Sequence, residues 1–205
     1  MDAEGNRDMI AAIDPSLCNT AVVIGLRAVW ESWVFRSEPI NTGKLKASAV
    51  VNRMARADGL LARIVPVFEN RPVEAIYLEG YAISANKAYK HDAVEYGGLL
   101  RWHLSDLEGV KTIREVMPTT LKKFTTGDHR ASKAKMAAYV GKRWGQTFET
   151  EDETDAYALW RLAHCCEGIF PCETDEQWET CKTVLSATAN RPRIGKPQLD
   201  LLLRS

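Results

Sequence analysis

The chain has 205 residues, of which 45% are hydrophobic and 26% charged, and its 27 Lys and Arg residues balance its 27 Asp and Glu residues. This size and composition indicate a globular domain and argue against an intrinsically disordered chain. No apolar run approaches the roughly 20 residues of a membrane-spanning helix. The start, MDAEGNRDM, carries acidic residues where a secretory signal would carry Lys or Arg, and no small-residue cleavage site follows an apolar stretch. We therefore expect a cytoplasmic protein of a bacterial or phage-infected cell, with no membrane partner.

The cysteines are odd in number, and four of the five come late in the chain: Cys18, Cys165, Cys166, Cys172 and Cys181. With no export signal, reduced thiols are expected. Zinc ligands usually come in pairs two to four residues apart. Here an adjacent pair is followed by gaps of six and nine residues. Buried thiols on helical faces are therefore favoured over a structural zinc site.

The first part of the chain is predicted to form three short strands, because runs rich in Val, Ile and Trp at 9–14, 19–26 and 29–35 are separated by turn-sized gaps. An antiparallel meander is the simplest arrangement of such strands. In the third run, Trp30 and Ser32 are expected to face the side opposite to Trp33.

The rest of the chain alternates helix and strand and then becomes helical. Apolar spacings of three, four and seven predict a helix from about residue 46 to about residue 70. Strands follow at 75–78 and 111–116, and further helices at 92–107, 119–124, 132–143, 154–167 and 174–187, with a tail over 190–205. This order predicts an α/β fold with a mixed five-stranded sheet, three antiparallel strands and then parallel strands, flanked by helices. Gly97 and Gly98 in the 92–107 helix would let another element approach closely.

Four acidic residues occupy positions where chemistry is expected. Asp14 and Glu79 end predicted strands, and ligands in open α/β sheets gather at the carboxyl ends of strands. Asp152 and Asp155 are three residues apart at a helix start, so both can share one face. Oxygen ligands of this kind suit Mg²⁺ or Mn²⁺, and two such ions roughly 4 Å apart can act on a phosphodiester. In the alternative interpretation, Asp152 belongs to an ordinary charged helix start and Asp14 is a turn residue.

Four sequence blocks come in a fixed order between Met9 and Gly168. They are IDPSLCNTA at 13–21, YLEGY at 77–81, PTTLKKFTTGDHRASK at 118–133 and DETDAYAL at 152–159. Together they resemble the signature blocks of the RuvC-type Holliday-junction resolvases. A phage-encoded, divergent member would suit the compact chain.

The resemblance implies an RNase H-like nuclease domain over residues 1–168, followed by a C-terminal helical extension and tail of unassigned role over residues 169–205. It also implies a homodimeric, metal-dependent endonuclease that resolves four-way (Holliday) junctions by paired symmetric nicks. Two Mg²⁺ ions per site, for which Mn²⁺ can substitute, would support hydrolysis that leaves 5′-phosphates. Branched DNA is the implied partner.

The same resemblance assigns roles to individual residues. The metal-binding catalytic carboxylates would be Asp14, Glu79, Asp152 and Asp155. Lys122 and Lys133 fall where the family places basic residues near the scissile phosphate. Lys123, Arg130 and Tyr81 are further candidates for DNA binding, and His129 is expected to be an exposed loop residue that could touch phosphate.

Several positions depart from the family pattern. Ser16 and Ala21 stand where glycine is usual, and Ala82 stands where many members carry an aromatic wedge, for which Tyr81 or Tyr89 could substitute. These departures leave open a broader structure-selective nuclease that acts on forks and flaps. A non-catalytic branched-DNA-binding protein is a second alternative. An ATPase of the actin and sugar-kinase type is disfavoured, because no second phosphate loop is found.

The neutral total hides a strong separation of charge along the chain. Residues 110–145 carry nine basic and two acidic residues, whereas residues 146–181 carry one basic and ten acidic residues. The basic segment contains Lys122 and Lys133, and the acidic segment contains Asp152 and Asp155. A zero net charge is therefore compatible with a DNA-binding surface beside a metal site.

Overall fold

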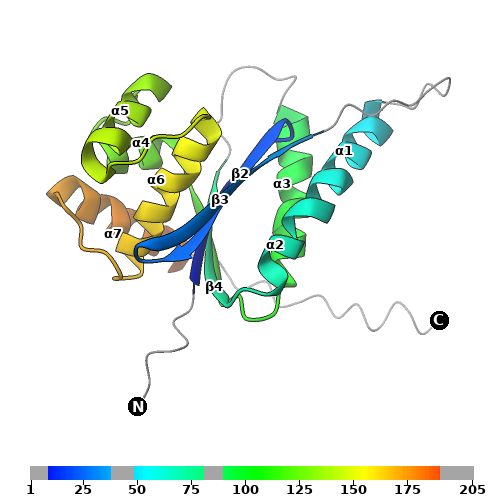
Figure 1. The fold of residues 1–205 in the computed structure, drawn as a ribbon, viewed down its shortest axis with the longest axis horizontal. Helices are drawn as coiled ribbons and strands as arrows, with labels where there is room; N and C mark the ends of the chain where they lie inside the picture. Colours follow the sequence, from blue (N-terminus) through cyan, green and yellow to red (C-terminus); the bar gives the residue numbers. More distant parts are fainter. Residues whose placement is uncertain (1–8, 38–48, 81–89, 190–205) are drawn as a thin grey trace, which may run out of the picture.

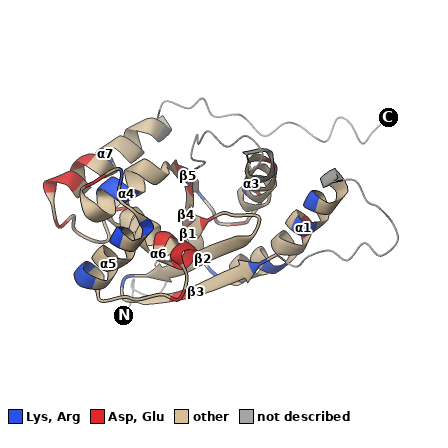
Figure 2. Cartoon of the chain, turned by 90° about the horizontal axis from the view of Figure 1, so that it is seen from above, with Lys and Arg blue, Asp and Glu red and all other residues tan. Residues whose placement is uncertain are grey.

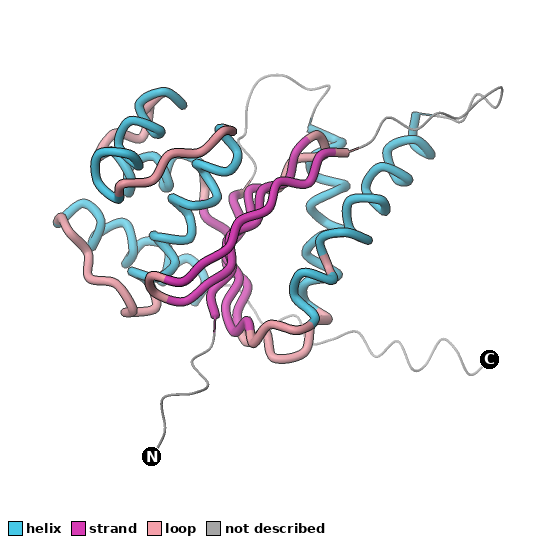
Figure 3. Tube along the Cα trace, in the orientation of Figure 1, coloured by secondary structure: helices cyan, strands magenta, loops and turns pink. Residues whose placement is uncertain are grey.

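The computed structural model describes residues 9–37, 49–80 and 90–189. A twisted sheet runs through the middle of the molecule, and helices cover both of its faces (Figures 1 and 3). The five strands are β1 (Met9–Asp14), β2 (Asn19–Leu26), β3 (Val29–Arg36), β4 (Val73–Glu79) and β5 (Thr112–Val116). Their order in the sheet is β3-β2-β1-β4-β5.

Strand pairing follows the predicted mixed pattern. β1 pairs antiparallel with β2, and β2 pairs antiparallel with β3. β4 lies parallel to both β1 and β5. The expected sheet of three antiparallel strands followed by parallel strands is therefore confirmed. β1 and β4 lie inside the sheet and are buried on both faces, which explains their nearly continuous apolar sequences.

The hairpin between β2 and β3 depends on one glycine. Gly25 pairs with Trp30 across the hairpin, and a Cβ at Gly25 would lie 2.5 Å from the Cα of Trp30. On β3, Trp30 packs against Tyr157 and Ser32 bonds to Glu153, so both point toward the same helix. The predicted shared face of Trp30 and Ser32 is confirmed.

Seven helices are present in the described ranges, divided between the two faces of the sheet. One face carries α1 (Ala49–Ile64), α2 (Pro66–Glu69) and α3 (Lys90–Ser105), and the other carries α4 (Pro118–Thr126), α5 (Lys133–Trp144), α6 (Glu151–Cys166) and α7 (Asp175–Ala189) (Figure 1). None of these helices is both long enough and apolar enough to cross a membrane.

Two of the predicted helices differ from the structure by three or more residues at one end, and the others differ by one or two. The helix expected to run to about residue 70 stops at Ile64, and a separate short helix starts at Pro66. Proline has no N–H to donate and clashes with the preceding turn, so a continuous helix breaks there. The helix expected from residue 154 begins at Glu151, because the Thr150 side chain accepts a hydrogen bond from the Glu153 backbone N–H.

Candidate metal centre

Two neighbouring parallel strands bring Asp14 and Glu79 together. Ile13 of β1 is in register with Leu78 of β4, and each acidic residue is the last residue of its strand. Because parallel strands end at the same edge of the sheet, the two carboxyl groups lie side by side. They share a side-chain hydrogen bond.

The first turns of α6 deliver the third carboxylate to the same point. Asp155 is 6% exposed, and α6 packs across β1 and β2. Ligand oxygens of Asp14, Glu79 and Asp155 all lie within 4.8 Å of one another. In the described part of the chain, no other group of three or more potential metal-ligand side chains meets this spacing. Hereafter these three residues are called the acidic triad.

The environment of the acidic triad disfavours three negative charges without a cation. Burial raises the pKa of Asp14 to about 7, while the hydrogen bond from Glu79 acts in the opposite direction. Burial, followed by the charge of Asp14, raises the pKa of Glu79 well above its usual value. Burial also raises the pKa of Asp155, although Lys133 opposes this rise. An oxygen-only donor set of this kind fits a hard divalent cation such as Mg²⁺.

Lys133 supplies the closest positive charge. Its Nζ lies 3.0 Å from Asp155 and 4.0 Å from Asp152, and its side chain is 43% exposed. Burial alone would lower the pKa of Lys133, but the surrounding carboxylates outweigh burial and raise it. Lys133 is therefore a permanent cation at the mouth of the acidic triad.

Asp152 and Lys122 lie at the edge of this group. The Asp152 side chain is 26% exposed and is not part of the acidic triad, although its charge raises the pKa of Asp14. Lys122 on α4 is half-buried, and its charge lowers the pKa of Asp155. Figure 2 shows basic residues on α4 and α5 beside the acidic first turn of α6.

The remaining DNA-binding candidates are spread more widely. Lys123 is exposed on α4 and lines a separate cavity, and Arg130 is exposed in the loop after α4. Tyr81 lies outside the described residues, as do Tyr89 and Ala82. The structure therefore places Lys122 and Lys133 near the acidic triad, but not Lys123.

Two supporting contacts were missing from the sequence-based prediction. Ser32 on β3 donates a hydrogen bond of 2.6 Å to Glu153 in the first turn of α6. The pattern Thr-x-x-Glu from Thr150 to Glu153 is a helix-start signature, so the position of this turn could have been predicted. No local pattern predicts the partner 121 residues away.

A second supporting contact lies behind Asp14. The Thr20 hydroxyl is fully buried, bonds to the Ser16 carbonyl oxygen at 2.9 Å and lies 2.7 Å from the Tyr96 hydroxyl of α3. This pair closes the turn that follows Asp14 and ties it to the opposite helix layer.

The late cysteines gather where α6 turns into α7. Cys165 and Cys181 are buried on these two helices, as expected, and the Cys172 sulfur lies 3.9 Å from the Cys181 sulfur. Burial raises the pKa of the Cys165 thiol, and it raises that of Cys172 to about 11. These groups therefore remain protonated thiols at neutral pH.

Comparison with known proteins reveals structural relatives. A structure of Thermus thermophilus RuvC matches with a TM-score of 0.56 and 17% identity, over 78% of this chain and 96% of that chain. T. thermophilus RuvC in complex with a Holliday junction substrate matches with a TM-score of 0.59 and 15% identity, over 79% and 96% of the two chains. The yeast mitochondrial Holliday junction resolvase Ydc2 gives a TM-score of 0.44 and 12% identity, over 88% and 81%.

No protein-family model matches the sequence, and a search of curated proteins finds no match. The likeness to RuvC therefore rests on structure, and it extends over almost the whole RuvC chain. It agrees with the observed strand order and the mixed pairing of the sheet. The chain has the RNase H-like fold of RuvC.

Proposed function

We propose that this protein is a metal-dependent endonuclease that cuts branched DNA, resolving four-way junctions by paired symmetric nicks. The observation that carries the proposal is the acidic triad, in which three carboxylates from β1, β4 and α6 lie within 4.8 Å at one edge of the sheet. Buried carboxylates this close have no structural benefit of their own and repel one another. Their chemistry is that of a cation site.

In the proposed site, Asp14, Glu79 and Asp155 would hold Mg²⁺, and the more exposed Asp152 would be a ligand of a second ion. When bound, the metal supplies Lewis-acid stabilisation of the phosphodiester oxygens and lowers the pKa of an attacking water. Mn²⁺ offers similar ligand chemistry. The protein contributes a fixed, partly buried set of oxygen ligands held by two strand ends and one helix.

Lys133 and Lys122 have different parts in the proposed mechanism. Lys133, whose Nζ lies 3.0 Å from Asp155, orients that carboxylate and offers a positive charge to a phosphate oxygen. Lys122 approaches from α4 and offsets negative charge on the DNA. Hydrolysis with in-line attack leaves a 5′-phosphate and a 3′-hydroxyl.

Homodimer formation belongs to the same proposal, because a four-way junction has two symmetric cut sites. Along α3, Val94 and Trp102 are each 55% exposed, and Gly98 between them has open space where a Cβ would lie. These residues are spaced by four and so form one face of α3. We infer that this face contacts the second protomer.

A sedimentation experiment tests this interface. Trp102→Glu is expected to turn a dimer into a monomer. A wild-type protein that stays monomeric with junction DNA would contradict the proposed homodimer.

A direct test compares cleavage of synthetic four-way junctions, forks, flaps and linear duplex in Mg²⁺, and in EDTA as the metal-free control. We expect two symmetric nicks in the junction and little cutting of linear duplex. Equal cutting of forks and flaps would favour a broader structure-selective nuclease. Binding without cleavage in Mg²⁺ and in Mn²⁺ would favour a non-catalytic DNA-binding protein.

A further inference from the structure

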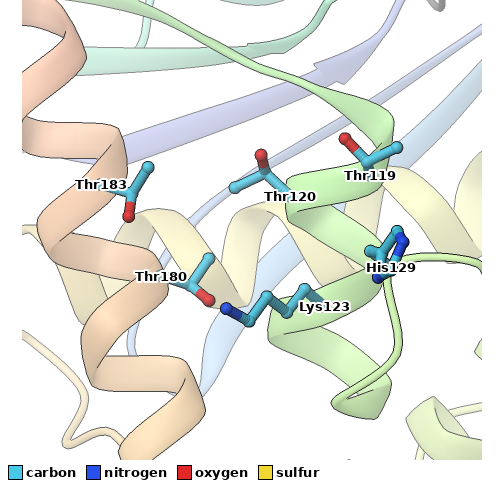
Figure 4. Close-up of a pocket in the computed structure, with 6 residues that line it drawn as sticks. All are labelled: Thr119, Thr120, Lys123, His129, Thr180 and Thr183. Carbon is cyan, nitrogen blue, oxygen red and sulfur yellow. The ribbon is translucent and has the colours of Figure 1, made fainter.

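A cavity of about 310 Å³ lies between α4 and α7, apart from the acidic triad. Its lining consists of Thr119, Thr120, Lys123, His129, Thr180 and Thr183. The volume is at the small end of the range for ligand-binding sites in proteins. Figure 4 shows Lys123 reaching from α4 toward Thr180 of α7, with His129 on the loop after α4. We call this space the α4–α7 cavity.

The chemistry of the α4–α7 cavity is that of an anion site. Lys123 forms no ion pair with any described residue, and no carboxylate is among the lining side chains. The hydroxyl groups of Thr119 and Thr120 have no described partner and are free to donate. The carboxylates of Glu176 and Glu179 on α7 do not line the cavity. Glu179 is paired with Lys182 at 2.6 Å.

The first turn of α4 adds to this preference for an anion. Its N-cap position is Met117, which makes no side-chain cap, and Pro118 follows it. The backbone N–H groups of Thr120 and Leu121 already donate to the Met117 carbonyl oxygen, which leaves the Thr119 N–H without a described acceptor. The helix dipole places partial positive charge at this end of α4. A lysine, an imidazole, two hydroxyls and one open backbone N–H thus lie around one space.

The wall contributed by α7 is anchored to the hydrophobic core. Thr180 is 3% exposed and its hydroxyl donates to the Glu176 carbonyl at 2.6 Å, while the Thr183 hydroxyl donates to the Glu179 carbonyl at 2.9 Å. Cys181 and Val184 on the same helix belong to the hydrophobic core. α7 therefore fixes the shape of the cavity instead of supplying its charge.

The position of the cavity on α4 suggests which anion it binds. Lys122 acts on the acidic triad, and Lys123 is turned about 100° around the same helix. If DNA contacts Lys122 as proposed above, its backbone lies beside the turn of α4 that also carries Lys123. We propose that the α4–α7 cavity binds a non-scissile backbone phosphate of the DNA, which gives α7 a role in substrate binding. This inference rests on the proposed function.

The first test measures junction binding at several salt concentrations, with every variant made in a cleavage-inactive Glu79→Gln background. Lys123→Ala is expected to weaken binding about 3- to 10-fold and to reduce the slope of log affinity against log salt by about 1. Thr183→Glu, at an exposed position, places a carboxylate beside Lys123 and should weaken binding at least as much.

Two matched controls accompany these variants. Lys111→Ala removes a cation paired with Glu74 at the far end of β5, and Leu185→Glu adds a carboxylate on α7 outside the lining of the cavity. Both should bind junctions like the parent. If Lys123→Ala and Thr183→Glu behave like these controls, the proposal is wrong.

A second test identifies the phosphate. Junctions carrying one neutral methylphosphonate at successive positions are compared in the parent and in Lys123→Ala. At the phosphate position that the cavity binds, a methylphosphonate should weaken junction binding by the parent protein. It should have no further effect on binding by Lys123→Ala. Equal effects in both proteins at every position would overturn the proposal.

A titration with inorganic phosphate distinguishes a site for a DNA backbone phosphate from a site for a free phosphate ligand. Amide NMR signals of Thr119 and Thr120 should shift with inorganic phosphate only in the millimolar range. Saturation at micromolar phosphate would instead make the cavity a site for free phosphate. All of these tests measure binding. If branched DNA is never cleaved but Lys123→Ala still weakens binding, the nuclease proposal fails and the cavity proposal stands. If branched DNA is cleaved normally but Lys123→Ala has no effect on binding, the cavity proposal fails and the nuclease proposal stands.

Discussion

The two helix layers that cover the sheet differ in what they bury. The layer of α1–α3 covers a cluster dominated by aliphatic side chains such as Leu60, Ile64 and Leu100. The layer of α4–α7 covers an aromatic cluster, in which Tyr157 and Trp160 stack at 5.7 Å, and also carries Asp155, Lys122 and Lys133. Both layers pack on the same two central strands.

The difference indicates a division of labour. The α1–α3 layer supports the sheet from behind, and its Tyr96 hydroxyl lies 2.7 Å from the Thr20 hydroxyl, which bonds to the turn that follows Asp14. The α4–α7 layer brings charged groups to the ends of β1 and β4. Substitutions in the first layer should therefore affect stability, and substitutions in the second should affect metal binding and chemistry. Four predictions test this comparison.

The largest effect is expected at Glu79. Glu79→Gln should lower junction cleavage about 1,000-fold or more, because metal-ion catalysis is worth several kcal/mol. Junction binding should be largely kept, since the basic contacts remain. The matched control is Glu74→Gln on the same strand, where the carboxylate pairs with Lys111 instead. Cleavage retained in Glu79→Gln would remove Glu79 from the site.

Next in size is a substitution on the opposite layer. Leu100 of α3 is fully buried, so Leu100→Ala should lower the free energy of unfolding by about 3 kcal/mol through lost burial and a cavity. Denaturant unfolding measures this loss. Metal affinity of the folded protein, measured by calorimetry, should stay within about 3-fold of wild type. A large loss of metal affinity would show that the layers are not separate in function.

A pH dependence follows from the acidic triad. The pKa of Asp14 is raised to about 7 in the folded protein, so the folded state binds this proton more tightly than the unfolded state does. The contribution of Asp14 to the stability of the metal-free protein should be full below about pH 4, decline as the pH rises towards 7, and level off above 7. Between about pH 6 and pH 8 we expect the melting temperature to fall by about 2–4 °C, or roughly 1 kcal/mol. Mg²⁺ should reverse the fall, and Asp14→Asn should flatten the profile.

The smallest effect is expected at Ser32. Ser32→Ala removes the hydrogen bond to Glu153 and should cost about 0.5 kcal/mol of stability. Because Glu153 lies in the turn that carries Asp152 and Asp155, cleavage should fall a few-fold through weaker metal binding. Extra Mg²⁺ should restore the rate. A rate that stays low at saturating Mg²⁺ would indicate another role for Ser32.

Local patterns in the sequence predicted most of the secondary structure. The alternation of Trp30 and Ser32, the apolar run of β4 and the helical spacing of α1 follow from side-chain periodicity. Pro66 and Thr150 carried readable signals for a helix break and a helix start. The position of acidic residues at strand ends predicted that Asp14 and Glu79 would meet.

The sequence by itself determined the succession of strands and helices along the chain, the separation of basic and acidic segments, and the acidic residues at the ends of two strands. These features depend on local periodicity and composition. Tertiary structure decided that Asp155 joins Asp14 and Glu79 while Asp152 stays at the edge. It also decided that Lys123 turns away from Lys122 toward α7. Such choices depend on how a helix packs across the sheet and on its rotation, and contacts between residues far apart in the chain set both.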